Sequence, residues 1–221
     1  ISRSISDDRG ETWQGMGFSP NSSVVYALGD SVYVYVYDVL GKLYNYQSLA
    51  GGPILTTDSF DVIVDVANYR NDFFALSLNG IFYSPDNGHT WQQTIDADTV
   101  SFNNPPSFNS YYSRLTVSEN YLYLSKPGEG LYRSGDKGAT WTFVYPPQGS
   151  GMNWDNVRIH TEGDTLFYAA GYLFISTDNG ETWQIRSNLG NSATDLSVDG
   201  NNWYVASNTG AYRSPDRGST W

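Results

Sequence analysis

The sequence predicts an all-β fold, and within that class a β-propeller made of four-stranded antiparallel blades. Three observations support this prediction. An eight-residue pattern, S-x-D-x-G-x-T-W, recurs five times along the 221 residues. The segments between the copies alternate apolar and polar residues as strands do, and helical periods are hard to find. Aromatic residues make up 16% of the chain and glycines number 22, which is typical of short strands joined by tight turns.

The repeated pattern, here called the Asp box, keeps Ser, Asp, Gly, Thr and Trp at fixed offsets. The copies are SDDRGETW at residues 6–13, SPDNGHTW at 84–91, SGDKGATW at 134–141, STDNGETW at 176–183 and SPDRGSTW at 214–221. The first gap is about twice the length of the others, which indicates a repeat that has lost its box. We place a degenerate box at residues 41–52, GKLYNYQSLAGG, which stands where GIFYSPDNGHTW stands later and lacks the box Asp, Gly and Trp.

One repeat can be followed strand by strand around the fourth box. NVRIHTEG, TLFYAA and YLFIS predict three successive strands, the box follows, and WQIRS predicts a fourth. Units of four strands at a period of about 40 residues are the blades of a propeller, in which each sheet packs on its neighbours around a central axis.

The two ends of the sequence predict partial blades. Residue 1 falls in a strand before a box, and residue 221 is the Trp of another box. We therefore expect four whole and two partial blades, and a ring of six or seven. Residues 1–221 are expected to form one propeller domain, or a segment of one cut from a longer chain.

Composition excludes several function classes. Lys and Arg number 12 and Asp and Glu 23, so the net charge of −11 disfavours a nucleic-acid partner. No apolar run approaches the roughly 18 residues that span a bilayer, so no transmembrane segment is predicted. The absence of cysteine excludes disulfides and thiol chemistry. It suits a bacterial surface protein as well as many cytosolic proteins, and we expect a secreted or cell-surface protein.

Each fixed residue of the box has a mechanical role. An Asp side chain in a turn accepts hydrogen bonds from backbone N–H groups further along the chain. Gly takes the positive φ of a tight turn, and Trp buries a large flat surface between blades. We therefore predict structural roles for Asp8, Gly10, Trp13, Asp86, Gly88, Trp91, Asp136, Gly138, Trp141, Asp178, Gly180, Trp183, Asp216, Gly218 and Trp221.

The five boxes resemble the Asp-box (BNR) repeat family of β-propellers, which includes sialidases, xyloglucanases with tandem propellers, sortilin-like receptors and photosystem assembly factors. The resemblance covers nearly the whole chain. It implies the fold but not one function, because these relatives do different things. It also implies that ligands bind on the face opposite the boxes.

The boxes are expected to ring a single face of the propeller. In an antiparallel four-stranded blade, the first-to-second and third-to-fourth turns emerge on the same face. The alternative role for the boxes is calcium binding. One carboxylate in an eight-residue loop is too few ligands, since calcium takes about six to eight oxygens. We therefore predict neither a metal nor a cofactor.

Two long connections on the opposite face are the predicted binding region. They span residues 96–114 and 146–156 and carry Phe102, Phe108, Tyr111, Tyr112 and Trp154 among Asn and Ser residues. Aromatic rings with amide and hydroxyl groups suit sugars, whose apolar faces stack while their hydroxyls need donors and acceptors. The predicted partners are a glycan or a protein at this face, and other domains of a longer chain. Alternatively, the aromatic residues only hold the long loops in place.

Catalysis is the competing hypothesis. The resemblance to sialidases implies an arginine triad, a Tyr/Glu nucleophile and an R-I-P motif, but no R-I-P occurs here. The arginines free for such work are Arg70, Arg114, Arg158 and Arg186. A xyloglucanase needs two carboxyl groups roughly 5 to 9.5 Å apart, and in that family the cleft lies between two propellers. Unpaired candidates are Asp61, Asp65, Asp155, Asp164 and Asp195. The sequence favours a non-catalytic binding or spacer module, with a glycoside hydrolase as the alternative.

Overall fold

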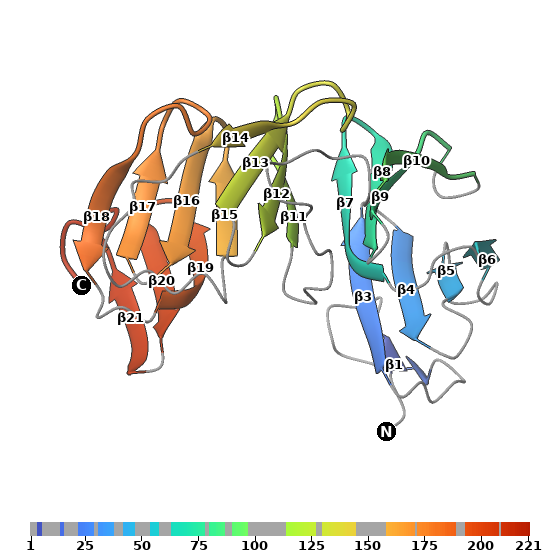
Figure 1. Ribbon diagram of the computed structural model, residues 1–221. Coiled ribbons are helices and arrows are strands. Elements are labelled where there is room, and N and C mark those ends of the chain that lie inside the picture. The colour runs from blue at the N-terminus through green and yellow to red at the C-terminus, as the bar shows by residue number, and fades with distance from the viewer. Residues whose placement is uncertain are drawn as a thin grey trace.

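The computed structural model is all-β (Figure 1). It describes residues 63–77, 80–86, 90–96, 114–126, 130–144, 158–170, 172–188, 193–207 and 209–221, and before residue 63 only the backbone of the strands. No helix in these parts of the chain is long and apolar enough to cross a membrane.

The N-terminal strands form three sheets. The first sheet pairs β1 (Ser4–Ile5) with β2 (Gln14–Gly15). The second contains β3 (Ser22–Leu28), β4 (Ser31–Tyr37), β5 (Lys42–Tyr46) and β6 (Ile54–Thr57). The third contains β7 (Ile63–Tyr69), β8 (Asp72–Ser77), β9 (Gly80–Ser84) and β10 (Gln92–Asp96). The predicted degenerate box contains β5 and the start of its connection to β6, the place that a box takes in the other sheets.

The C-terminal strands form three more sheets. One contains β11 (Arg114–Val117), β12 (Leu122–Lys126), β13 (Gly130–Ser134) and β14 (Thr142–Val144). The next contains β15 (Arg158–Glu162), β16 (Thr165–Ala170), β17 (Tyr172–Ser176) and β18 (Gln184–Asn188). The last contains β19 (Ala193–Asp199), β20 (Asn202–Ser207) and β21 (Gly210–Ser214).

Every sheet is an antiparallel meander in chain order. The first strands of successive sheets are neighbours: β3 contacts β7, β7 contacts β11, β11 contacts β15, and β15 contacts β19. The sheets therefore follow one another around a common side with their first strands innermost, as Figure 1 shows. The prediction of an all-β propeller with four-stranded antiparallel blades is confirmed. Four sheets have four strands, one has three and one has two.

The core lies between the blades because strands alternate their side chains across the two faces of a sheet. Within β16, Leu166 and Tyr168 pack against the β11–β14 blade, and Phe167 and Ala169 pack against the β19–β21 blade. These four side chains are almost completely buried. Strands buried on both faces need continuous apolar sequence, which explains why TLFYAA does not alternate strictly.

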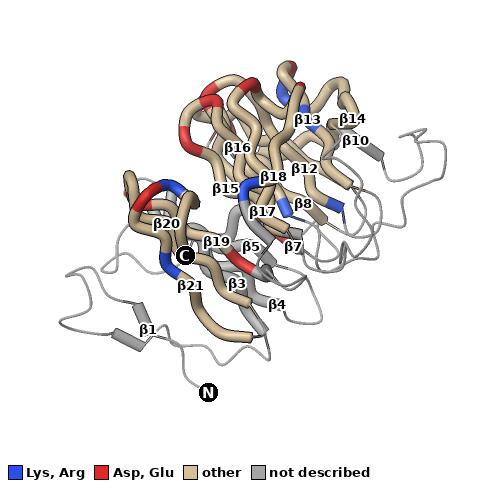
Figure 2. The backbone as a smooth tube through the Cα atoms, turned by 90° about the vertical axis from the view of Figure 1, so that its left-hand side faces the viewer, with Lys and Arg blue, Asp and Glu red and all other residues tan. Residues whose placement is uncertain are grey.

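Charged residues lie mostly outside this core. Figure 2 shows most of the Asp and Glu residues of the described segments in turns or at the ends of strands, whereas Lys and Arg residues also lie on the strands. Most of the negative charge of these blades thus lies at the ends of their strands.

Candidate functional site

The box turn at residues 176–183 is held together by its own Asp. Both oxygens of Asp178 accept hydrogen bonds. Oδ1 accepts from Ser176 Oγ at 2.7 Å and from the Thr182 N–H at 2.9 Å, and Oδ2 accepts from Thr182 Oγ1 at 2.6 Å. Ser176 Oγ also accepts from the Gly180 N–H at 2.7 Å. The turn therefore satisfies its own polar groups without a metal or a ligand.

The same contacts recur at the other described boxes. Ser Oγ, Thr N–H and Thr Oγ1 donate to the Asp carboxylate within 2.5–2.8 Å at Asp86, Asp136 and Asp216. Gly138, Gly180 and Gly218 have φ of 84°, 92° and 81°, which glycine adopts freely. Asp8, Gly10, Trp13 and Gly88 lie outside the described residues.

The box Trp packs against the core between blades at Trp141, Trp183 and Trp221. Trp183 Nε1 donates to the Gly180 carbonyl at 3.0 Å, and Trp141 makes the same bond to Gly138. The Trp183 ring packs edge-on against Tyr168, with 5.9 Å between ring centroids. Trp183 also joins the apolar cluster between the β11–β14 and β15–β18 blades. Each box side chain thus performs a local structural task.

Hydrogen bonding lowers the pKa of the box carboxyl groups. The Thr182 hydroxyl and then the Thr182 N–H lower the pKa of Asp178 to about 2, from an ordinary 3.8. The Thr220 N–H and then the Thr220 hydroxyl lower that of Asp216 to about 2. Because these folded-state pKa values lie below the unfolded value, the stabilisation is complete above about pH 4 and is lost as the pH falls through 2.

We expect urea unfolding to show this loss of stability at low pH directly. The free energy of unfolding of the wild type should decline between about pH 4 and pH 2 more steeply than that of the Asp178→Asn/Asp216→Asn double variant. Thr182→Val, which removes one hydroxyl donor, should give an intermediate slope. Parallel pH profiles for wild type and double variant would contradict the assignment.

Boxes and first-to-second turns share one face, here called the box face. The Asn179 N–H in a box donates to the carbonyl of Asp164 in the adjacent turn at 3.1 Å, and the Arg217 N–H donates to the carbonyl of Asn201 at the same distance. The face opposite is the one predicted to bind ligands. Its five predicted aromatic residues, Phe102, Phe108, Tyr111, Tyr112 and Trp154, lie outside the described residues.

Four charged residues occupy one register position on the innermost strands, toward the end away from the boxes. Asp65, Arg114, Arg158 and Asp195 pair with Leu76, Ser125, Ala169 and Ala206 of the second strands. The sequence named these residues as candidates but did not predict that they share a position. Recognising it requires the strand register.

The two carboxylates of this set, Asp65 and Asp195, accept hydrogen bonds from backbone N–H groups. Asp65 is buried, and its Oδ1 and Oδ2 accept from the Val66 N–H at 3.0 Å and the Leu115 N–H at 2.9 Å, which links two blades. Asp195 Oδ1 accepts from the Leu196 N–H at 2.9 Å. Asp164 lies on the box face and accepts from Asn120 Nδ2 at 2.9 Å. Asp65 and Asp195 are thus committed to backbone amides, and Asp61 and Asp155 lie outside the described part of the structure.

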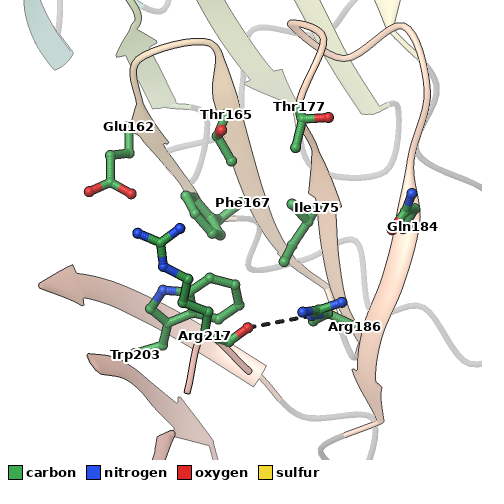
Figure 3. Close-up of a pocket in the computed structure, with 9 residues that line it drawn as sticks. All are labelled: Glu162, Thr165, Phe167, Ile175, Thr177, Gln184, Arg186, Trp203 and Arg217. Atoms are coloured by element: carbon green, nitrogen blue, oxygen red, sulfur yellow. Dashed lines mark hydrogen bonds between the residues drawn. The ribbon is translucent and has the colours of Figure 1, made fainter. Parts of the chain in front are cut away.

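A groove on the box face was missed by the sequence analysis. It lies between the β15–β18 and β19–β21 blades and has a volume of about 230 Å³. Figure 3 shows Phe167, Ile175 and Trp203 at its floor and charged and polar side chains at its rim. Arg186, which the sequence identified only as an arginine free for other work, lines it together with the box residue Arg217. No group of three or more His, Cys, Asp or Glu residues in the described segments is placed to hold a metal ion.

Blades of four antiparallel strands with self-contained Asp turns define an Asp-box β-propeller. Comparison with known proteins agrees: the family model of the BNR/Asp-box repeat matches residues 174–184. The chain thus carries the BNR/Asp-box repeat within β-propeller blades.

Three relatives show the range of this class. The chain is 29% identical to xyloglucanase Xgh74A of Acetivibrio thermocellus over 188 residues, which is 80% of this chain and 19% of that protein. It is 26% identical to a sialidase of Clostridium perfringens over 236 residues, covering 100% of this chain and 52% of the sialidase. The solved structure of YCF48 bound to D1 peptide superposes with a TM-score of 0.65 at 14% identity, covering 96% of this chain and 70% of YCF48, which supports the fold alone. The chain thus spans about a fifth of the xyloglucanase and about half of the sialidase.

Proposed function

We propose that the chain is a non-catalytic propeller of a secreted or cell-surface protein. In this proposal it binds a glycan or a protein on the face opposite the boxes, or spaces other domains. One observation carries the proposal: the carboxylates Asp65 and Asp195, on the innermost strands, accept backbone N–H groups. A carboxylate committed to its own fold is a poor acid, base or nucleophile, because those roles need it to face a substrate.

The direction of the box pKa shifts supports the same conclusion. A glycosidase acid must keep its proton near neutral pH, so its pKa is raised. Hydrogen bonds lower the pKa of Asp178 and Asp216 instead. The box carboxylates therefore suit a structural role better than proton transfer.

A glycoside hydrolase is the second candidate. The xyloglucanase and sialidase relatives favour it, since both are named as enzymes that act on carbohydrates. We expect the purified chain to release no reducing sugar from xyloglucan and no sialic acid from sialyllactose. Release that Asp65→Asn or Asp195→Asn abolishes, with folding retained, would establish the hydrolase instead.

The binding face is tested by the aromatic residues of the long loops. We expect Tyr112→Ala and Trp154→Ala each to weaken binding by roughly 1–3 kcal/mol, if their rings stack on the ligand. Ligands found on glycan and protein arrays would be titrated by calorimetry. Tyr204→Ala is the control, because Tyr204 is an exposed aromatic residue of β20 and does not belong to either long connection in the sequence. Binding that tolerates both loop variants but fails in a box-face variant would reverse the assignment of faces.

A further inference from the structure

The groove between the β15–β18 and β19–β21 blades has counterparts at the other blade junctions. The strand register shows which residues of the different junctions correspond to one another. Immediately before the box Ser, the three blades carry Tyr83, Arg133 and Ile175. Each box Ser pairs with a residue of the second strand, and immediately before that partner the same blades carry Asp72, Tyr121 and Thr165.

At the junction of the β11–β14 and β15–β18 blades, the counterpart is filled by Arg133. Its guanidinium donates to the Asn179 carbonyl at 2.8 Å and forms an ion pair with Glu181, both in the next box. The guanidinium also lies over the Tyr121 ring, 4.8 Å from its centroid. A cation, a carboxylate and an aromatic ring thus close this groove.

The junction of the β7–β10 and β11–β14 blades is closed by the same chemistry with different residues. Lys137, from the box, forms an ion pair with Asp72 and lies 5.8 Å from the Tyr83 ring centroid. A cation from one blade again meets a carboxylate from its neighbour.

The third junction keeps one of the two cations but lacks both carboxylates. Arg217 takes the box position of Lys137, but Thr165 takes the position of Asp72, and Ser219 that of Glu181. Ile175 replaces Arg133 and is too short to fill the space. These replacements by smaller side chains explain the 230 Å³ opening.

Hydrogen-bond donors around the opening lack partners in the described part of the chain. Arg217 donates through Nε to Asn201 Oδ1 at 2.9 Å, and Arg186 donates through Nε to the Arg217 carbonyl at 3.4 Å. The terminal nitrogens of both guanidinium groups make no hydrogen bond to the described residues. Trp203 is 5% exposed, and its buried Nε1 also has no partner there. Figure 3 shows this nitrogen on the side of Arg217 and Glu162.

We propose that this groove is a second binding site, on the box face, that takes a carboxylate side chain of a partner protein. Arg binds a carboxylate through two parallel N–H donors, and the indole N–H adds a third donor that no cation ligand would satisfy. The volume admits one small group rather than a drug-sized ligand, for which pockets of roughly 300–1,000 Å³ are usual. The filled junctions show that Asp or Glu side chains fit this place. The inference is independent of the ligand proposed for the opposite face.

Glu162 at the rim of the groove is expected to reduce the affinity for a carboxylate. It lines the groove and makes no ion pair with Arg217. Its charge opposes an incoming carboxylate, so its removal should strengthen binding. Glu162→Gln is therefore a gain-of-affinity test.

The experiment is an NMR titration of the chain with N-acetylglutamate α-amide, followed at the indole resonance of Trp203. We expect this probe to shift the resonance and N-acetylglutamine α-amide to leave it unchanged. Arg217→Asn, which installs the residue found in the box at 176–183, should weaken binding by about tenfold. Arg213→Gln is the matched control: it removes the same charge from β21, outside the groove, and should bind like the wild type.

A second variant tests the comparison of junctions. Thr165→Asp supplies the carboxylate that Asp72 supplies two blades earlier, and should close the groove by pairing with Arg217. We expect it to abolish probe binding while keeping or raising the melting temperature. Equal binding of both probes, or loss of binding in Arg213→Gln equal to that in Arg217→Asn, would overturn the proposal. Binding of glucuronate without N-acetylglutamate α-amide would overturn it in favour of a sugar acid.

Discussion

Gly180→Ala should destabilise the chain by about 3 kcal/mol, through backbone strain and overpacking acting together. Gly180 is buried and has φ of 92°, a conformation that alanine adopts only with strain. A Cβ at this position would overlap Val144 Cγ1 and lie 3.2 Å from Leu166 Cδ1. Both side chains belong to the core between two blades, so they have little room to move.

Gly163→Ala is the control that separates the two causes. Gly163 lies in the same blade with φ of 59°, and a Cβ there would meet nothing within 4 Å. We expect it to cost only the backbone strain, roughly 1 kcal/mol. Thermal unfolding followed by circular dichroism measures both, at about 3 °C per kcal/mol for a domain of this size. Equal losses in the two variants would show that contact with Val144 adds nothing.

A double-mutant cycle tests the contact itself. Val144→Ala opens space beneath Gly180 at a cost of its own. If the overlap with Val144 Cγ1 is real, Gly180→Ala should cost less in the Val144→Ala background than in the wild type. Simple additivity would mean that the strain is entirely in the backbone.

The box turns were predictable from sequence because their interactions are local. Ser176, Asp178, Gly180 and Thr182 satisfy one another within eight residues, so fixed offsets reveal the constraint. The four-stranded blades were predictable for the same reason: a short period repeats. In a repeat protein, each repeat contains most of the interactions that determine its own fold.

The groove was not predictable in this way because no single repeat contains it. It depends on Thr165 replacing an acid, Ile175 replacing an arginine and Ser219 replacing another acid, in three strands or turns of two blades. Each change alone is an ordinary substitution at a variable position. A comparison of the repeats position by position would have shown that the carboxylates are missing, but only the strand register says which positions face each other.

Asp65 shows a second reason why the sequence alone does not predict the role of a residue. The sequence identified it only as one of several catalytic candidates without a partner at a suitable spacing. In the structure, a register shift in β7 turns it toward backbone amides of two strands, one of them in the next blade. Irregularities of this kind depend on long-range pairing, which periodicity does not report.

The second large effect is expected at the box carboxylate. Asp178→Ala removes the acceptor for Ser176 Oγ and for the N–H and hydroxyl of Thr182. Ser176 is buried, so its hydroxyl cannot exchange this partner for water. We expect a loss of roughly 1–3 kcal/mol, because an unsatisfied buried donor costs more than an average hydrogen bond contributes.

Asp178→Asn should separate the effect of losing the negative charge from the effect of losing the whole side chain. It keeps one oxygen as an acceptor for Ser176 Oγ and the Thr182 N–H, but its amide nitrogen cannot accept from Thr182 Oγ1, so the loss should be smaller than for alanine. Measured by urea unfolding at neutral pH, the order of stability should be wild type, Asn, then Ala. Below about pH 2 the wild type should approach the Asn variant, because protonation removes the charge that distinguishes them. A box that served a ligand instead would give three proteins of equal stability, since nothing in the fold would then depend on the carboxylate.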